Sequence, residues 1–240
     1  MKPNSAIFAF PKGVTRNFYI VMLALFLFSF YPLRSQQSAI DSINTKIQNL
    51  KKQRPTTFKD TTYVHLLYEL GGKYRYISND SLYAISLRIR EISKEIAYDK
   101  GGIYALMRLG DYYSNKGFDE KSLNHYLEAY NLAGQKDYTG IKLDLFINLG
   151  YVYSLLGNYE NAFKSYLEGI DLASTFEDKY LEHLSILNEA IANLYTSQKE
   201  YKQALSFFKE TKKINDKIGD EKIQAETMVG LASVLAEMKQ

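Results

Sequence analysis

The chain has 240 residues, of which 46% are hydrophobic and 24% are charged, and its formal net charge is +3. This composition is ordinary for a folded protein, and the absence of cysteine excludes disulfide frameworks and thiol catalysis. The positive sign comes from Lys2, Lys12, Arg16 and Arg34, because residues 1–35 contain no acid. The rest is nearly neutral and has no long basic stripe, so the sequence argues against a nucleic-acid partner.

Residues 1–35 have the pattern of an export signal. A basic start precedes the apolar run 18–31, which ends at Pro32, and this order is typical of a secretory signal peptide. The run is shorter than the roughly 20 residues of a membrane-spanning helix. Cleavage after Ser35 is therefore the first interpretation, and an uncleaved signal anchor is the alternative. Either way, we expect the rest of the chain to be periplasmic, or anchored at the membrane by this segment alone and facing the periplasm.

Residues 36–58 are expected to form one amphipathic helix and a linker. Ile40, Ile43, Ile47 and Leu50 have the 3-4-3 spacing of a single helix face, and Pro55 ends the pattern. We interpret this helix as a cap on the domain that follows, with partner binding as the alternative.

From residue 60 onward, one motif recurs about every 40 residues, and such a period is the signature of stacked helix pairs. Its best copy is Leu149-Gly150 followed by Tyr153, and a second helix carries Ala162 and Tyr166 in step. Glycine inside a helix costs about 1 kcal/mol relative to alanine, so Gly150 indicates close approach of another helix. The first-helix motif recurs at Leu70-Gly71 with Tyr74, Leu109-Gly110 with Tyr113, Ile191-Ala192 with Tyr195, and Leu231-Ala232 with Leu235.

This motif resembles the tetratricopeptide repeat, which has a Leu-Gly-x-x-Tyr core on its first helix and small residues on its second. The resemblance covers residues 60–240 and implies an all-α fold, a right-handed helical-repeat solenoid of about four full helix-turn-helix units plus a terminal helix. The usual period is about 34 residues, and the longer period resembles the exported sensory part of bacterial sensor kinases and regulators. The expected units are residues 63–96, 103–133, 143–173 and 180–215, with an incomplete unit at 221–240.

Three details of local structure follow from the same pattern. Residues 99–102 are expected to form the turn before the second unit, and Asp80 or Ser81 is expected to cap the second helix of the first unit. The last helix has the first-helix pattern with no second helix after it. We interpret the chain as a piece of a longer protein, with a terminal cap as the alternative.

Catalytic signatures are missing from the sequence. His65, His125 and His183 fall in different units, and none has a second metal ligand at a suitable offset. The Gly71-Gly72 pair lacks the frame of a phosphate loop. We therefore expect no enzyme activity, no metal and no cofactor.

The resemblance places function in the groove that first helices line in this repeat family. Aromatic and arginine side chains there favour a protein or peptide partner, and ordinary solvated positions are the alternative. Capture of a C-terminal carboxylate is disfavoured, because His65, Tyr104, Asp144 and Ile186 replace the lysines of that mode. The residues expected in the groove are Tyr104, Met107, Arg108, Asp111, Asp144, Ile147, Asn148, Tyr151, Glu189 and Asn193.

The sequence as a whole predicts an exported protein–protein interaction domain, acting as the sensory or assembly part of a bacterial signalling system. A free-standing periplasmic scaffold with no signalling output is the alternative. The sequence contains no indication of an oligomeric state.

Overall fold

The computed structural model describes residues 36–53, 60–134 and 136–238, and the chain divides into two compact units, Met1–Gln53 and Arg54–Gln240. The described part of the first unit is one helix over residues 36–53, where the sequence predicted an amphipathic helix. Its role as a cap stays a prediction. The predicted export signal and the linker at 54–59 lie outside the described residues.

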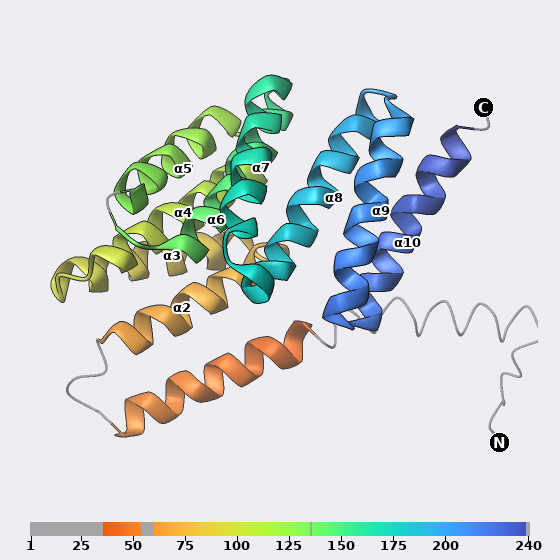
Figure 1. Ribbon diagram of the computed structural model, residues 1–240. Coiled ribbons are helices and arrows are strands. Elements are labelled where there is room, and N and C mark those ends of the chain that lie inside the picture. The colour runs from red at the N-terminus through yellow and green to blue at the C-terminus, as the bar shows by residue number, and fades with distance from the viewer. Residues whose placement is uncertain (1–35, 54–59, 135, 239–240) are drawn as a thin grey trace, which may run out of the picture. The chain divides into compact units, whose positions relative to one another are not determined.

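The described part of the second unit consists of helices in consecutive packed pairs (Figure 1). The pairs are α2 (Thr61–Tyr74) with α3 (Asn79–Glu95), α4 (Asp99–Asn115) with α5 (Asp119–Gly134), α6 (Thr139–Leu155) with α7 (Tyr159–Ser174), and α8 (Leu181–Ser197) with α9 (Tyr201–Ile218). A 3-10 helix, η1 (Glu177–Tyr180), precedes α8, and α10 (Glu221–Glu237) follows α9. First helices also contact one another, α2 with α4 and α6 with α8. The predicted all-α solenoid of helix pairs is confirmed.

Residues with a left-handed backbone conformation form turns within the helix pairs and after α9. Gly117 and Gly157 have φ of +73° and +71° between the two helices of their pairs, and Gly219 has φ of +75° at the end of α9. Glycine adopts this conformation without the steric penalty that a Cβ brings. In the fourth pair Lys199 fills the same role with φ of 61°.

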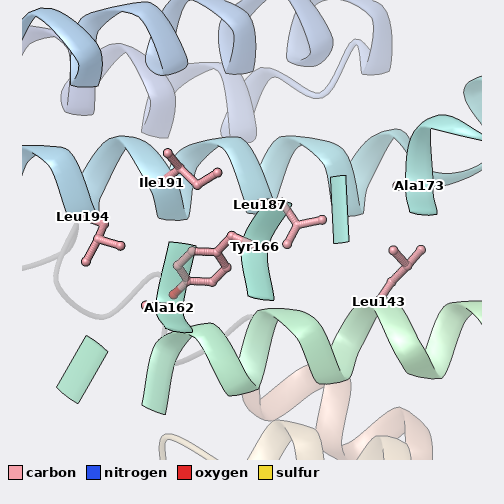
Figure 2. Packing of buried hydrophobic residues seen from close by; sticks show 7 residues of the cluster. All are labelled: Leu143, Ala162, Tyr166, Ala173, Leu187, Ile191 and Leu194. Atoms are coloured by element: carbon pink, nitrogen blue, oxygen red, sulfur yellow. The ribbon is translucent and has the colours of Figure 1, made fainter. Parts of the chain in front are cut away.

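The glycine of the repeat motif marks close helix contact, as predicted. A Cβ added to Gly110 would lie 2.6 Å from Cε1 of Tyr126, and Gly150 is packed against Tyr166 in the same way. Figure 2 shows Tyr166 among the buried apolar residues of the third and fourth pairs. These residues are Leu143, Ala162, Tyr166, Ala173, Leu187, Ile191 and Leu194.

Two local predictions are wrong. Residues 99–102 are the first turn of α4, and Gly101 lies there because its missing side chain makes room for the Ser93 hydroxyl and the Tyr98 ring. The N-cap of α3 is Ser78, whose hydroxyl accepts a hydrogen bond from the Ser81 amide at 3.2 Å. In both cases residues typical of turns or caps also occur inside a helix, so residue type alone misplaces the boundary.

Candidate partner-binding surface

A buried polar cluster connects the first three helix pairs. Asp111 on α4 is fully buried, and its carboxylate accepts hydrogen bonds from Tyr126 Oη and Arg108 Nη1, both at 2.6 Å. Arg75 Nη1 pairs with the same carboxylate at 3.2 Å and also donates to Asn148 Oδ1 at 3.4 Å. Three donors therefore hold one buried carboxylate, so Asp111 serves the fold and is not available to a partner.

Arg108 turns back onto α2. Its Nε donates to the Tyr68 carbonyl at 3.1 Å, and its guanidinium carbon lies 3.9 Å from the centroid of the Tyr68 ring. Gly71 leaves the space for this side chain, because a Cβ there would be 3.1 Å from Arg108 Cδ. With 12% of its side chain exposed, Arg108 is a packing residue, whereas the sequence predicted a residue that points into the groove.

The Tyr68 ring stacks on the ring of Tyr104 in α4, and the two ring centroids are 4.0 Å apart. Burial raises the pKa of both phenols, so both stay neutral. Tyr104 also contacts His65, edge to face at 5.2 Å between centroids. Burial and then the Lys100 ammonium lower the pKa of His65.

The stacked tyrosines form one wall of a pocket of about 460 Å³, which we call the aromatic pocket. Every helix pair of the solenoid contributes to its lining. Its residues are Tyr68 of α2, Lys100 and Tyr104 of α4, residues 137–141 and Asp144 around the start of α6, Phe176, Lys179 and Tyr180 at η1, and His183 of α8.

Charged groups surround the rings of the aromatic pocket. Lys100 Nζ lies 5.4 Å from the centroid of the Tyr138 ring, and Lys179 Nζ lies 5.1 Å from that of Tyr180. Cation–π contacts at exposed sites contribute about 0.5–1 kcal/mol each. Asp144 Oδ1 is 3.2 Å from His183 Nε2, and 43% of the Asp144 side chain is exposed. The lining therefore combines aromatic rings with charged and polar side chains of both signs.

The residues that the sequence placed in the groove are divided among several environments. Tyr104 and Asp144 line the aromatic pocket. Arg108, Asp111 and Asn148 belong to the buried polar cluster. Ile147 packs against the core of the third pair, and Met107 is buried with 1% exposure. The remaining three lie outside the pocket lining: Tyr151 and Asn193 are exposed and Glu189 is half-buried.

Sequence reasoning missed most of the aromatic pocket, namely Tyr68, Lys100, Tyr138, Phe176, Lys179, Tyr180 and His183. Several of these residues lie in segments that the repeat pattern treats as turns. A signal was present, because Tyr138 and Phe176 are aromatic at positions where turns usually carry small or polar residues.

A membrane-spanning helix and a metal-binding cluster are not found in the part of the chain that the structure describes. No helix within residues 36–53, 60–134 and 136–238 is long and apolar enough to cross a membrane. The same ranges contain no group of three or more His, Cys, Asp or Glu that could hold a metal ion.

Comparison with known proteins agrees with this fold. Residues 143–176, which include α7 and most of α6, match the tetratricopeptide repeat family model. No curated protein matches the chain.

Solved structures with similar folds include BtubC from P. vanneervenii, with a TM-score of 0.64, 13% identity, and coverage of 85% of this chain and 84% of that chain. A signal transduction ATPase with a tetratricopeptide repeat sensor from Pyrococcus horikoshii has a TM-score of 0.62 and 16% identity over 91% of this chain. Apo RapI has a TM-score of 0.60 and 16% identity over 85% of this chain. The matched regions span 37% of the ATPase and 61% of RapI.

At these identities the likeness shows the fold. The family match and the structural neighbours together support a tetratricopeptide repeat protein, and this fold suggests a scaffold for protein–protein interaction.

Proposed function

We propose that this chain is a non-catalytic interaction domain that binds an extended peptide or protein segment at the aromatic pocket. One observation carries the proposal: side chains from all four helix pairs converge on this pocket. A ligand there would contact every pair at once, as an elongated partner on a solenoid does.

The lining also indicates which chemical groups a partner segment should carry. Tyrosine and phenylalanine rings supply large contact areas at low conformational cost. Asp144 is a partly exposed acceptor, and Lys100 and Lys179 are donors on flexible stems. A segment with an apolar anchor and flanking charged groups of both signs complements this lining.

We further propose that the domain acts outside the cytoplasm, as the sensory or assembly part of a bacterial signalling system. The order of residues 1–35 supports export. The similar Pyrococcus horikoshii ATPase has its tetratricopeptide repeats as a sensor within a longer signal transduction protein.

Selection from a displayed random-peptide library tests the binding proposal. Peptides enriched on the wild-type chain are labelled, and their dissociation constants are measured by fluorescence anisotropy. Phe176→Ala combined with Asp144→Asn should weaken binding by about tenfold or more, because about 1.4 kcal/mol lost corresponds to a factor of ten. Both side chains are partly exposed, so the fold should be preserved.

Tyr159→Ala is the matched control, because Tyr159 is an aromatic residue, 43% exposed, at the start of a second helix outside the pocket. Its affinity for the same peptides should equal that of the wild type. The proposal is contradicted if no peptide is enriched, or if the pocket variant and the control bind equally well.

A further inference from the structure

A second pocket, of about 440 Å³, lies where the first helix pair passes into the second. It is formed by the end of α3, the start of α4, the end of α5 and the connection from α5 to α6. We call it the basic groove, and its lining includes Arg90, Ser93, Lys94, Gly102, Lys136 and Tyr138. Tyr138 also lines the aromatic pocket, so the two pockets are neighbours.

Three cationic side chains of the basic groove have no acidic partner. Arg90 and Lys94 are four positions apart on one face of α3, where like charges destabilise a helix, and Lys136 follows α5. None of the three forms an ion pair or hydrogen bond within the described ranges. In contrast, the exposed Lys212 and Lys213 of α9 both pair with acids. An anion in the groove would therefore relieve the repulsion among its cations.

The buried hydroxyl of Ser93 also lacks a partner. Ser93 lies on the same face of α3 as Arg90 and Lys94 and is 3% exposed. Its Oγ lies against Gly101 in the first turn of α4 and has no hydrogen-bond partner in the described part of the chain. An unpaired buried hydroxyl is unfavourable, so a ligand oxygen that accepts a hydrogen bond from Ser93 would be stabilised there.

The first turn of α4 supplies further donors. Its N-cap residue, Tyr98, makes no side-chain cap hydrogen bond, and the amides of Asp99 and Lys100 have no acceptor among the described residues. Such amides and the helix dipole attract anions to a helix N-terminus. Gly102 leaves this side of the turn open, because a Cβ there would meet no atom within 4 Å.

Charge and shape indicate the class of ligand. Beside its three cations the lining contains one acid, Asp99, which leaves a net charge of +2. A phosphate monoester carries about −1.5 to −2 at pH 7 and so complements this charge. Ile103, Leu132 and Tyr138 add apolar surface, and Leu132 is 44% exposed. The volume of the groove also lies within the roughly 300–1,000 Å³ of small-molecule sites.

We propose that the basic groove binds a small organic phosphate. The phosphate lies at the first turn of α4, where the Ser93 hydroxyl and the unpaired amides donate hydrogen bonds to its oxygens. Arg90, Lys94 and Lys136 neutralise its charge, and such charge-assisted contacts are the stronger ones. The apolar body of the ligand packs on Leu132 and Tyr138. This ligand differs from the peptide proposed for the aromatic pocket, and neither site requires the other.

Phenyl phosphate is a suitable probe, because it joins a phosphate to an apolar ring. Isothermal titration calorimetry of the full chain should give a dissociation constant of about 0.1–1 mM. Inorganic phosphate and benzyl alcohol each keep one half of the probe, and phenylacetate carries a single negative charge. All three should bind about tenfold more weakly or worse. The proposal is overturned if phenyl phosphate shows no saturable binding, or if any of the three binds as tightly.

Substitutions test the placement of the phosphate. Arg90→Gln with Lys94→Gln should weaken phenyl phosphate binding by about tenfold or more. The matched control, Lys212→Gln with Lys213→Gln, removes the same two charges from exposed positions on α9 and should bind like the wild type. Equal affinities for the two double variants overturn the site.

Ser93→Ala separates ligand binding from a structural role. It should weaken phenyl phosphate binding by about tenfold without lowering the urea midpoint, because the hydroxyl has no partner within the described fold. A Ser93→Ala chain that binds phenyl phosphate like the wild type overturns this placement of the phosphate.

Discussion

Gly150 shows how a missing side chain positions two helices. The Tyr166 ring of α7 occupies the space that a Cβ at Gly150 would need, so Gly150→Leu should force the pair apart. Overpacking costs about 1–3 kcal/mol, and the improved helix propensity returns under about 1 kcal/mol. We therefore expect a net loss of unfolding free energy, measured by urea denaturation.

Gly134 supplies the matched control for this substitution. It is the last residue of α5, and a Cβ there would meet no atom within 4 Å. Gly134→Leu should therefore unfold close to the wild-type midpoint. A Gly150→Leu chain as stable as wild type would show that helix contact does not explain this glycine.

Asp111 is the second residue with a large expected effect. Asp111→Ala leaves the guanidinium groups of Arg75 and Arg108 without their shared carboxylate, and breaking a buried pair costs about 3–5 kcal/mol. Glu91→Ala is the control, because Glu91 pairs with Arg88 at the exposed surface, where a pair contributes about 1 kcal/mol or less. Equal unfolding free energies for the two variants would refute a structural role for the buried cluster.

His65 links stability to pH. Burial and then Lys100 lower the pKa of His65 from its ordinary 6.5, so below pH about 6.5 the unfolded chain binds more protons and folding stability falls. Between about pH 7 and pH 5, the wild type should therefore lose more unfolding free energy than His65→Gln. The measurement is urea denaturation across this range, and parallel curves for the two chains would contradict the assignment.

At the scale of helices, periodicity predicted more than residue type did. The apolar spacing and the Leu-Gly-x-x-Tyr motif predicted the helix pairs and the contact at Gly150. The ends of the helices were less predictable. Gly101 lies inside α4, where it serves helix packing, and Ser78 caps α3 in place of the expected Asp80 or Ser81. Periodicity reports which face of a helix is buried, whereas an end depends on local hydrogen bonds.

The candidate site was predicted less completely, for a related reason. Counting along the first helices found Tyr104 and Asp144, but it also selected Arg108 and Asp111, which the structure uses for packing. A position on a helix face does not reveal whether a long side chain reaches solvent or folds back onto a neighbour. The rings of Tyr138, Phe176 and Tyr180 come from segments without periodicity, so only the folded chain brings them to the aromatic pocket.

For the whole molecule, the aromatic pocket exists only because the pairs stack. No single pair contains it, since its lining extends from Tyr68 in α2 to His183 in α8. Solenoid stability is approximately a sum of pair and nearest-neighbour terms. Gly150→Leu, which distorts the third pair at the contact of α6 with α7, should therefore weaken ligand binding as well as stability.

Export is the last expectation, and it depends on residues 1–35. Fused to a reporter that is active only outside the cytoplasm, this segment should give activity, because its basic start stays in the cytoplasm while the apolar run inserts. The control is Leu25→Arg with Leu27→Arg, since each arginine at the centre of such a run costs about 2.5–3.5 kcal/mol. A soluble, inactive wild-type fusion would contradict export. N-terminal sequencing then separates the two interpretations: a start near Gln36 indicates cleavage, and an intact N-terminus on membrane-bound protein indicates an anchor.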